Sequence, residues 1–137
     1  MTETVSRITD AQSAEWEVPD YTTQQFSDRA NRYCVCVFVI NEGEKIRKQL
    51  QGMAEYADRV DIIIADGGSM DGSLEPAYLE SCRVTALLTK TSPGKLSAQM
   101  RMAFAYALLA GYEGIITIDG NNKDGIEAIP RFIEALD

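Results

Sequence analysis

Residues 33–40 read YCVCVFVI, and this stretch decides the fold. It contains no charged residue and is rich in β-branched and aromatic side chains, a composition typical of a strand. Because it is apolar on both faces, it predicts a strand that is buried inside a parallel sheet. Residues 60–65, VDIIIA, repeat the pattern, and further strands are predicted over residues 83–88 and 114–118.

Segments with a helical spacing of apolar residues separate these strands. Helices are predicted over residues 42–57, from Asp71 as N-cap to about residue 81, over 95–110 and over 124–136. Strand and helix therefore alternate four times, which predicts an α/β fold, a Rossmann-like parallel sheet with helices on both faces.

The domain organisation follows from where this alternation begins. We expect one α/β domain over residues 31–137. Residues 1–30 are polar and aperiodic, and there we expect a loosely ordered leader with one short helix around residues 10–16.

Composition excludes several classes of function. The chain has 137 residues, a net charge of -8 and no histidine, which argues against nucleic-acid binding and rules out a Ser-His-Asp triad within it. Cys34, Cys36 and Cys82 form no CxxC pair, so a zinc site is not expected. The sequence has no apolar run of about 20 residues and no signal-like start, and it predicts a cytoplasmic chain without a membrane span.

Parallel sheets bind ligands beyond the carboxyl ends of their strands. The segments that follow the predicted strands are INEGE, ADGGSMDGS, TKTSPGK and IDGNNKDG, and they are rich in Gly, Asp and Asn. They do not match the common nucleotide motifs. NEGEKI has one glycine where a dinucleotide fingerprint needs three. Around Gly94 and Lys95, Thr89 and Leu96 replace the first glycine and the hydroxyl residue of a P-loop.

Taken in order, these segments resemble the motifs of family 2 glycosyltransferases. DIIIADGGSMDGS resembles the family's strand and DDGSxD turn, and VFVINEGEKI its first strand and Asn-Glu turn. SPGKLSAQMRMAFAYA resembles its Gly-Lys turn and helix, and IITIDGNNKDGIEAIPRFIEAL its strand, DxD region and helix. The likeness covers residues 33–137 and is nearest to the dolichyl- or polyprenyl-phosphate sugar transferases. It implies the nucleotide-binding half of a GT-A fold, without the acceptor half of the domain.

The resemblance also implies a site for a nucleotide-diphosphate-sugar donor. Its residues would be Ile40, Glu42, Asp66, Gly68, Lys95 and Asp119. Asp66 would accept a hydrogen bond from the base, and Lys95 at a helix start would face phosphate. Asp119 and Asn121 would bind Mg²⁺ or Mn²⁺, although Asn121 stands where the family has a second carboxylate.

Each of these residues also fits a purely structural role. Asp66 can begin an Asp-Gly turn, Glu42 is a first-turn glutamate that the helix dipole favours, Lys95 can be a solvated lysine, and IDGNN can be a simple turn. Gly67 replaces the second Asp of the DDGS form. The site hypothesis therefore depends on Asp66 and Asp119 meeting at one edge of the sheet with their side chains on the same face.

The expected function is an inverting glycosyltransferase that moves a sugar from this donor to a lipid-phosphate or saccharide acceptor. A lipid acceptor such as polyprenyl phosphate would place it at the cytoplasmic face of a membrane. No catalytic base can be named, and the resemblance puts it in a later segment, so we expect these 137 residues to bind donor weakly and to turn over poorly or not at all.

The alternative is a non-catalytic nucleotide-binding or interaction module that retains the fold, which the replacements at Gly67 and Asn121 motivate. A nucleotidyltransferase would need a Gly- and Arg-rich loop that INEGEKIRK does not supply.

Overall fold

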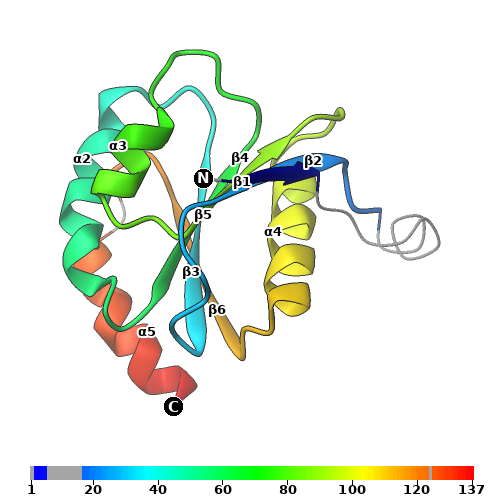
Figure 1. Ribbon diagram of the computed structural model, residues 1–137. Helices are drawn as coiled ribbons and strands as arrows, with labels where there is room; N and C mark the ends of the chain where they lie inside the picture. Colours follow the sequence, from blue (N-terminus) through cyan, green and yellow to red (C-terminus); the bar gives the residue numbers. More distant parts are fainter. Residues whose placement is uncertain (1, 6–16, 124) are drawn as a thin grey trace.

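A mostly parallel sheet forms the centre of the molecule. The computed structural model describes residues 2–5, 17–123 and 125–137. Within these residues the sheet has six strands in the order β1-β2-β5-β4-β3-β6 (Figure 1). The parallel strands are β5 (Ala86–Lys90), β4 (Asp61–Asp66), β3 (Tyr33–Val39) and β6 (Gly114–Asp119). The predicted α/β fold with a mostly parallel sheet is confirmed.

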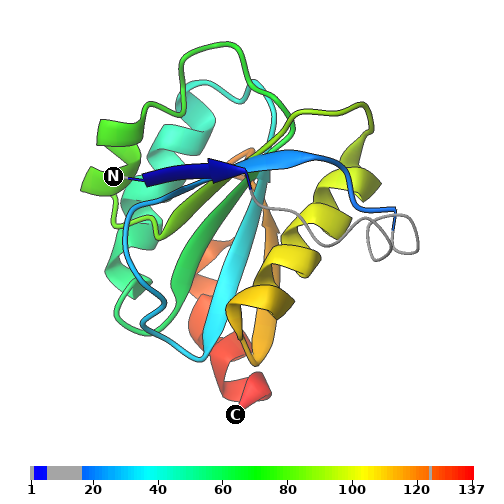
Figure 2. The ribbon, with the colours of Figure 1, turned by 45° about the vertical axis from the view of Figure 1, so that its right-hand side comes forward.

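Helices cover both faces of this sheet. On one face lie α2 (Glu44–Met53) with the 3₁₀ turn η1 (Ala54–Tyr56), α3 (Pro76–Ser81), the 3₁₀ turn η2 (Ile126–Ala128) and α5 (Ile129–Leu136). On the other face lies α4 (Leu96–Ala110). Figure 2 shows this separation from a second direction. We call the two sides the α2 face and the α4 face. The predicted placement of helices on both faces is confirmed.

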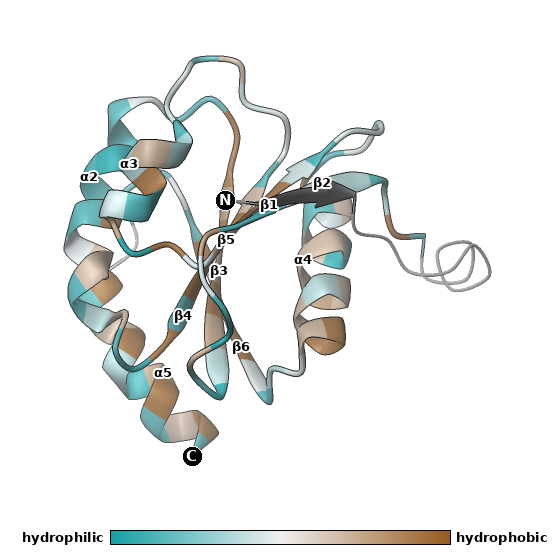
Figure 3. Cartoon of the chain, viewed as in Figure 1, coloured by the Kyte–Doolittle hydropathy of each residue, from teal (hydrophilic) through white to brown (hydrophobic). Residues whose placement is uncertain are grey.

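Strand β3 is buried at all seven positions, as its sequence predicts. Its residues alternate between two hydrophobic cores. Val35, Val37 and Val39 pack on the α2 face, whereas Cys34, Cys36 and Phe38 pack on the α4 face. Figure 3 shows the hydrophobic colour running along the strands. Each fully buried Val, Ile, Leu or Met contributes roughly 1.5–3 kcal/mol, so these two layers fix the pleat of the central strand.

The N-terminal segment differs from its prediction. Strands β1 (Thr2–Val5) and β2 (Tyr21–Gln25) extend the sheet, with β1 antiparallel to β2 and β2 antiparallel to β5. Tyr21 and Thr23 are buried, so the expectation of a loosely ordered leader is wrong for this part. The physical reason is that β5 would otherwise expose a row of unpaired backbone groups at its edge. The helix predicted around residues 10–16 lies outside the described residues.

Helix α3 begins later than predicted, because Pro76 occupies its first turn and Glu75 is its N-cap. Asp71 is therefore not the N-cap of this helix. Its Oδ1 accepts hydrogen bonds from the backbone N and Oγ of Ser73, and its Oδ2 accepts one from the backbone N of Gly43. These bonds, those from Ser73 foremost, lower the pKa of Asp71.

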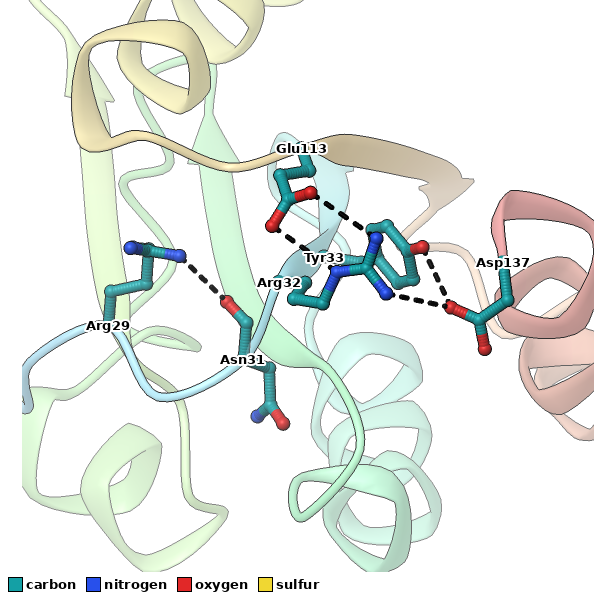
Figure 4. Close-up of polar contacts among 6 residues, drawn as sticks. All are labelled: Arg29, Asn31, Arg32, Tyr33, Glu113 and Asp137. Atoms are coloured by element: carbon teal, nitrogen blue, oxygen red, sulfur yellow. Dashed lines mark hydrogen bonds and ion pairs between the residues drawn. The ribbon is translucent and has the colours of Figure 1, made fainter.

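A polar cluster closes the end of the sheet where the parallel strands begin (Figure 4). The Arg32 guanidinium lies over the ring of Tyr33 and forms ion pairs with Glu113 and Asp137. The Tyr33 hydroxyl donates to Asp137 Oδ1 at 2.7 Å. The cluster joins the starts of β3 and β6 to the last residue of the chain, and these polar groups satisfy one another.

Candidate functional site

The strand order places a candidate site at the opposite end of the sheet. From β3 the chain adds β4 and β5 on one side, and then returns to place β6 on the other side of β3. The order therefore reverses at β3 and β6, where ligands bind in open α/β sheets. A cleft of about 380 Å³ lies there, and its lining includes Ile40, Glu42, Gly67, Lys95, Gln99 and Asp119. All four segments that the sequence singles out contribute to it.

Lys95 brings positive charge to this cleft. It is the N-cap of α4 and is exposed. No side chain caps the start of α4 among the described residues, so the first backbone N–H groups of this 15-residue helix are available at the same end. The lysine and the positive end of the helix dipole together favour an anionic group.

Glu42 brings an acceptor that has no partner. Its Oε2 is buried, and no described residue donates a hydrogen bond to it. A buried polar atom without a partner is costly and rare in folded proteins. Because Glu42 lines the cleft, its unpartnered Oε2 can accept a hydrogen bond from a ligand N–H or O–H group, or can bind a cation.

Asp119 ends β6 and is held by a buried glutamine of α2. Gln49 is fully buried, and its Nε2 donates to the backbone O of Asp119 at 2.9 Å. Its Oε1 accepts from the backbone N of Asn122 at 2.8 Å, which fixes the turn after the strand. The sequence analysis missed Gln49, although a polar residue within the apolar stripe of Ile46 and Leu50 is the signal that would have found it.

Asp66 lies at the same edge of the sheet as Asp119 but on the other face. Asp66 pairs in register with Val39 of β3, whereas Asp119 pairs with Phe38. Since Val39 packs on the α2 face and Phe38 on the α4 face, the pleat turns the two carboxylates apart. The expected shared edge is confirmed, and the expected shared face is wrong, so the donor site that needs both carboxylates on one face is not formed. A donor site at this cleft has to be argued without Asp66, which does not line it.

One oxygen of the Asp66 carboxylate, Oδ1, is occupied by its own loop. Its Oδ1 accepts from the backbone N of Gly68 at 3.1 Å and from the backbone N and Oγ of Ser69 at 2.9 and 2.7 Å. Gly68 has a φ of 112°, a left-handed conformation that favours glycine. Gly68 therefore serves this turn, while Gly67, its neighbour, lines the cleft.

The same loop is bonded to the turn that follows β3. Asn41 donates its backbone N to Ser69 Oγ, and its side-chain Oδ1 accepts from the backbone N of Met70 at 2.8 Å. Arg47 donates to the backbone O of Gly72. These bonds tie the two loops into one wall on the α2 side of the rim.

Gln99 is a second buried glutamine that the sequence analysis missed. It lies on α4, is 6% exposed, and lines the cleft. Its Nε2 donates to the backbone O of Val39 at 3.2 Å and to the backbone O of Ala65 at 3.1 Å. It therefore joins the ends of β3 and β4 beneath the cleft. The signal, as for Gln49, is a polar side chain on the buried stripe of a helix.

Comparisons with models of known protein families, with curated proteins and with solved structures find no match to this chain. The likeness to family 2 glycosyltransferases therefore rests on the motifs in the sequence. Among the helices that the structure describes, none has the length and apolar character to cross a membrane.

The metal pair predicted from the sequence consists of Asp119 and Asn121. Asn121 Oδ1 accepts from the backbone N of Lys123 at 3.0 Å, which uses one of the two lone pairs of the amide oxygen. Within residues 2–5, 17–123 and 125–137, no three His, Cys, Asp or Glu side chains are grouped to hold a metal ion. Asp119 lines the cleft, but the site with Asn121 that the sequence predicts remains a prediction.

The residues that line the cleft divide it into a positively charged part and a negatively charged part. Lys95 and the start of α4 suit phosphate, whereas Glu42 and Asp119 suit hydroxyl groups or a cation. A ligand with an anionic end and a hydroxyl-rich end matches this division.

Proposed function

We propose that this cleft binds a nucleotide-diphosphate-sugar, as the Rossmann-like, donor-binding half of a family 2-like inverting glycosyltransferase of the GT-A type. The observation that carries the proposal is convergence. Ile40, Glu42, Lys95 and Asp119 come from three separate segments and line one cleft where the strand order reverses. Those are four of the six donor-site residues that the motifs imply.

The charges suggest how the donor would lie. Its diphosphate would face Lys95 and the N-terminal end of α4, where backbone N–H groups and the ammonium attract anions. Its sugar hydroxyls would donate to carboxylate oxygens, which include the unpartnered Oε2 of Glu42. With two carboxylates against one lysine, direct binding of a diphosphate is expected to be weak.

Mg²⁺ or Mn²⁺ would offset this repulsion, and metal binding at Asp119 belongs to the proposal. Asp119 lines the cleft and Asn121 does not, so no step is assigned to the metal ion. No described residue is assigned the role of catalytic base. A polyprenyl phosphate or a saccharide is the proposed acceptor, and the proposed location is cytoplasmic, at a membrane face for the lipid case.

Calorimetric titration tests donor binding. UDP-, GDP- and CDP-sugars are titrated with and without Mn²⁺ into the wild-type chain and into Asp119→Asn and Lys95→Gln variants. Lys48→Gln, an exposed lysine of α2, is the matched control. We expect one donor class to bind, and both cleft substitutions to weaken it while the control does not. If no donor binds, either with or without Mn²⁺, the proposal is wrong.

A non-catalytic nucleotide-binding module is the second candidate. It is favoured by the Asp66 carboxylate, which lies on the other face, and by Asn121, which does not line the cleft. An assay for release of nucleoside diphosphate in the presence of polyprenyl phosphate separates the two. Donor binding without release of nucleoside diphosphate favours the non-catalytic module. Sugar transfer by the isolated chain at the rate of a longer form would refute our expectation that these residues turn over poorly.

A further inference from the structure

The side-chain amide of Gln99 has a fixed orientation at the floor of the cleft. Its Nε2 donates to the backbone O of Val39 and to that of Ala65. Carbonyl oxygens only accept, so the nitrogen and not the oxygen of the amide must face the strands. No described residue donates to its Oε1. A side chain that is 94% buried thus keeps one unused acceptor at a cleft that it lines.

Gly67 leaves this acceptor accessible. A Cβ atom built at Gly67 would lie 2.9 Å from Cδ of Gln99 and 3.1 Å from both its Oε1 and its Nε2. The backbone of Gly67 therefore lies directly against the amide, and any side chain there would cover it or push it aside. Both residues line the cleft, so the glycine keeps the path from the cleft to Oε1 open.

Gln99 reaches the end of β4, where the motifs imply an acceptor for the nucleobase. The sequence predicts an acceptor for the nucleobase at the end of β4, yet the Oδ1 of Asp66 is saturated by its own loop and its side chain lies on the α2 face. Gln99 reaches the same strand end through Ala65, from the α4 face where the cleft lies.

We propose that Gln99 is a specificity-determining residue whose Oε1 accepts a hydrogen bond from a ring N–H of the ligand. This inference rests on the proposed function for the kind of ligand. Among nucleotides, uracil and guanine carry such a ring N–H at their pairing edge, whereas cytosine and adenine present a bare ring nitrogen there. Two acceptors facing each other repel, so Gln99 selects uridine or guanosine nucleotides against cytidine and adenosine nucleotides.

Removal of the ring proton tests this selection. The wild-type chain is titrated with UDP, N3-methyl-UDP, GDP, N1-methyl-GDP and CDP, and with uridine, N3-methyluridine, guanosine and N1-methylguanosine as nucleoside arms. We expect UDP or GDP to bind about tenfold more tightly than its methylated form, the loss expected for one buried hydrogen bond. Which of the two pairs shows the ratio identifies the base.

Gln99→Met, which keeps the length but removes the amide, should bring this ratio close to one. Gln51→Met, the same change at an exposed position of α2, should leave the ratio unchanged. The ratio is an internal measure, because a general loss of affinity affects both ligands alike. Gln99→Met also removes two hydrogen bonds to the strands. Should it fail to fold, ¹⁵N spectra of the wild type replace it: the Gln99 amide signals should shift with the parent nucleotide but not with its methylated form.

The outcomes separate this inference from the proposed function. Equal binding of methylated and parent nucleotides, or Gln99 signals that do not respond, overturns the role of Gln99 and leaves donor binding intact. Discrimination that is as strong for the nucleosides, with no gain from the diphosphate or sugar, supports Gln99 and overturns the donor site. Absence of binding by every nucleotide and nucleoside overturns both.

Discussion

The two faces of the sheet differ at the same edge. On the α2 face, Asp66, Ser69 and Asn41 bond to one another and to nearby backbone. On the α4 face, the Oε2 of Glu42 and the Oε1 of Gln99 find no donor among the described residues. The comparison teaches that position at the carboxyl end of a strand does not by itself make an acidic residue part of a site. Glu42 and Gln99 line the cleft and Asp66 does not, so the unpartnered oxygens that can meet a ligand in the cleft are those of Glu42 and Gln99.

Asp66→Ala should have the largest effect on stability. It removes the acceptor of three hydrogen bonds from a side chain that is 4% exposed. We expect a loss of about 2–3 kcal/mol in the free energy of unfolding, because three half-buried donors lose their acceptor. Urea unfolding measures the loss, with the exposed Asp28→Ala as control.

This substitution also sharpens the comparison between the faces. If Asp66 is structural, the nucleotide affinity of the folded variant should change less than about threefold. A change of this size corresponds to less than about 1 kcal/mol in binding free energy, which is expected for a residue that does not contact the ligand. A loss of more than tenfold with the fold intact would return Asp66 to the ligand.

Gly67→Ala should have the next largest effect. Its new methyl would press on the Gln99 amide at 2.9 Å, and overpacking of this kind costs about 1–3 kcal/mol. The cost should largely disappear in a Gln99→Ala background, where the space is free. A double-mutant cycle by urea unfolding measures the coupling, and additive losses would contradict the contact.

Lys95→Gln should affect binding rather than stability. The lysine is exposed and lines the cleft, so its loss should weaken nucleoside diphosphate binding about fivefold, a typical value for one partly solvated charge. The midpoint of urea unfolding should stay the same. If instead the unfolding midpoint falls and affinity does not, Lys95 belongs to the fold and not to the site.

Asp71→Asn should have the smallest effect, and one that depends on pH. Hydrogen bonds from Ser73 hold the pKa of Asp71 below its usual value of 3.8. A carboxyl group with a lowered folded-state pKa stabilises the fold above its unfolded pKa and loses this contribution as pH falls through the folded value. Wild type should therefore exceed the variant in stability at pH 6, and the difference should narrow below about pH 4. Unfolding curves across this range measure it, and a difference that grows on acidification would have the wrong sign.

Much of the fold could be predicted because its signals are local. The apolar run of residues 33–40 and the helical stripe of residues 95–110 give β3 and α4 within one residue at each end. Elements that form only because of a contact with another part of the chain were not predicted. YTTQQ, residues 21–25, becomes a strand because the edge of β5 offers it backbone partners. Pro76 outweighed Asp71 at the start of α3, because proline suits the first turn of a helix and Asp71 bonds to Ser73 instead.

The sequence by itself determined which segments stand at one edge of the sheet. Every parallel strand ends at that edge, so the segment after each strand must lie there. Only the tertiary structure decided which polar atoms face the cleft. A shift of one residue in register separates Asp66 from Asp119, and Gln99 reaches Val39 across 60 residues of chain. Register and contacts of this range depend on how the whole sheet packs, and no local pattern encodes them.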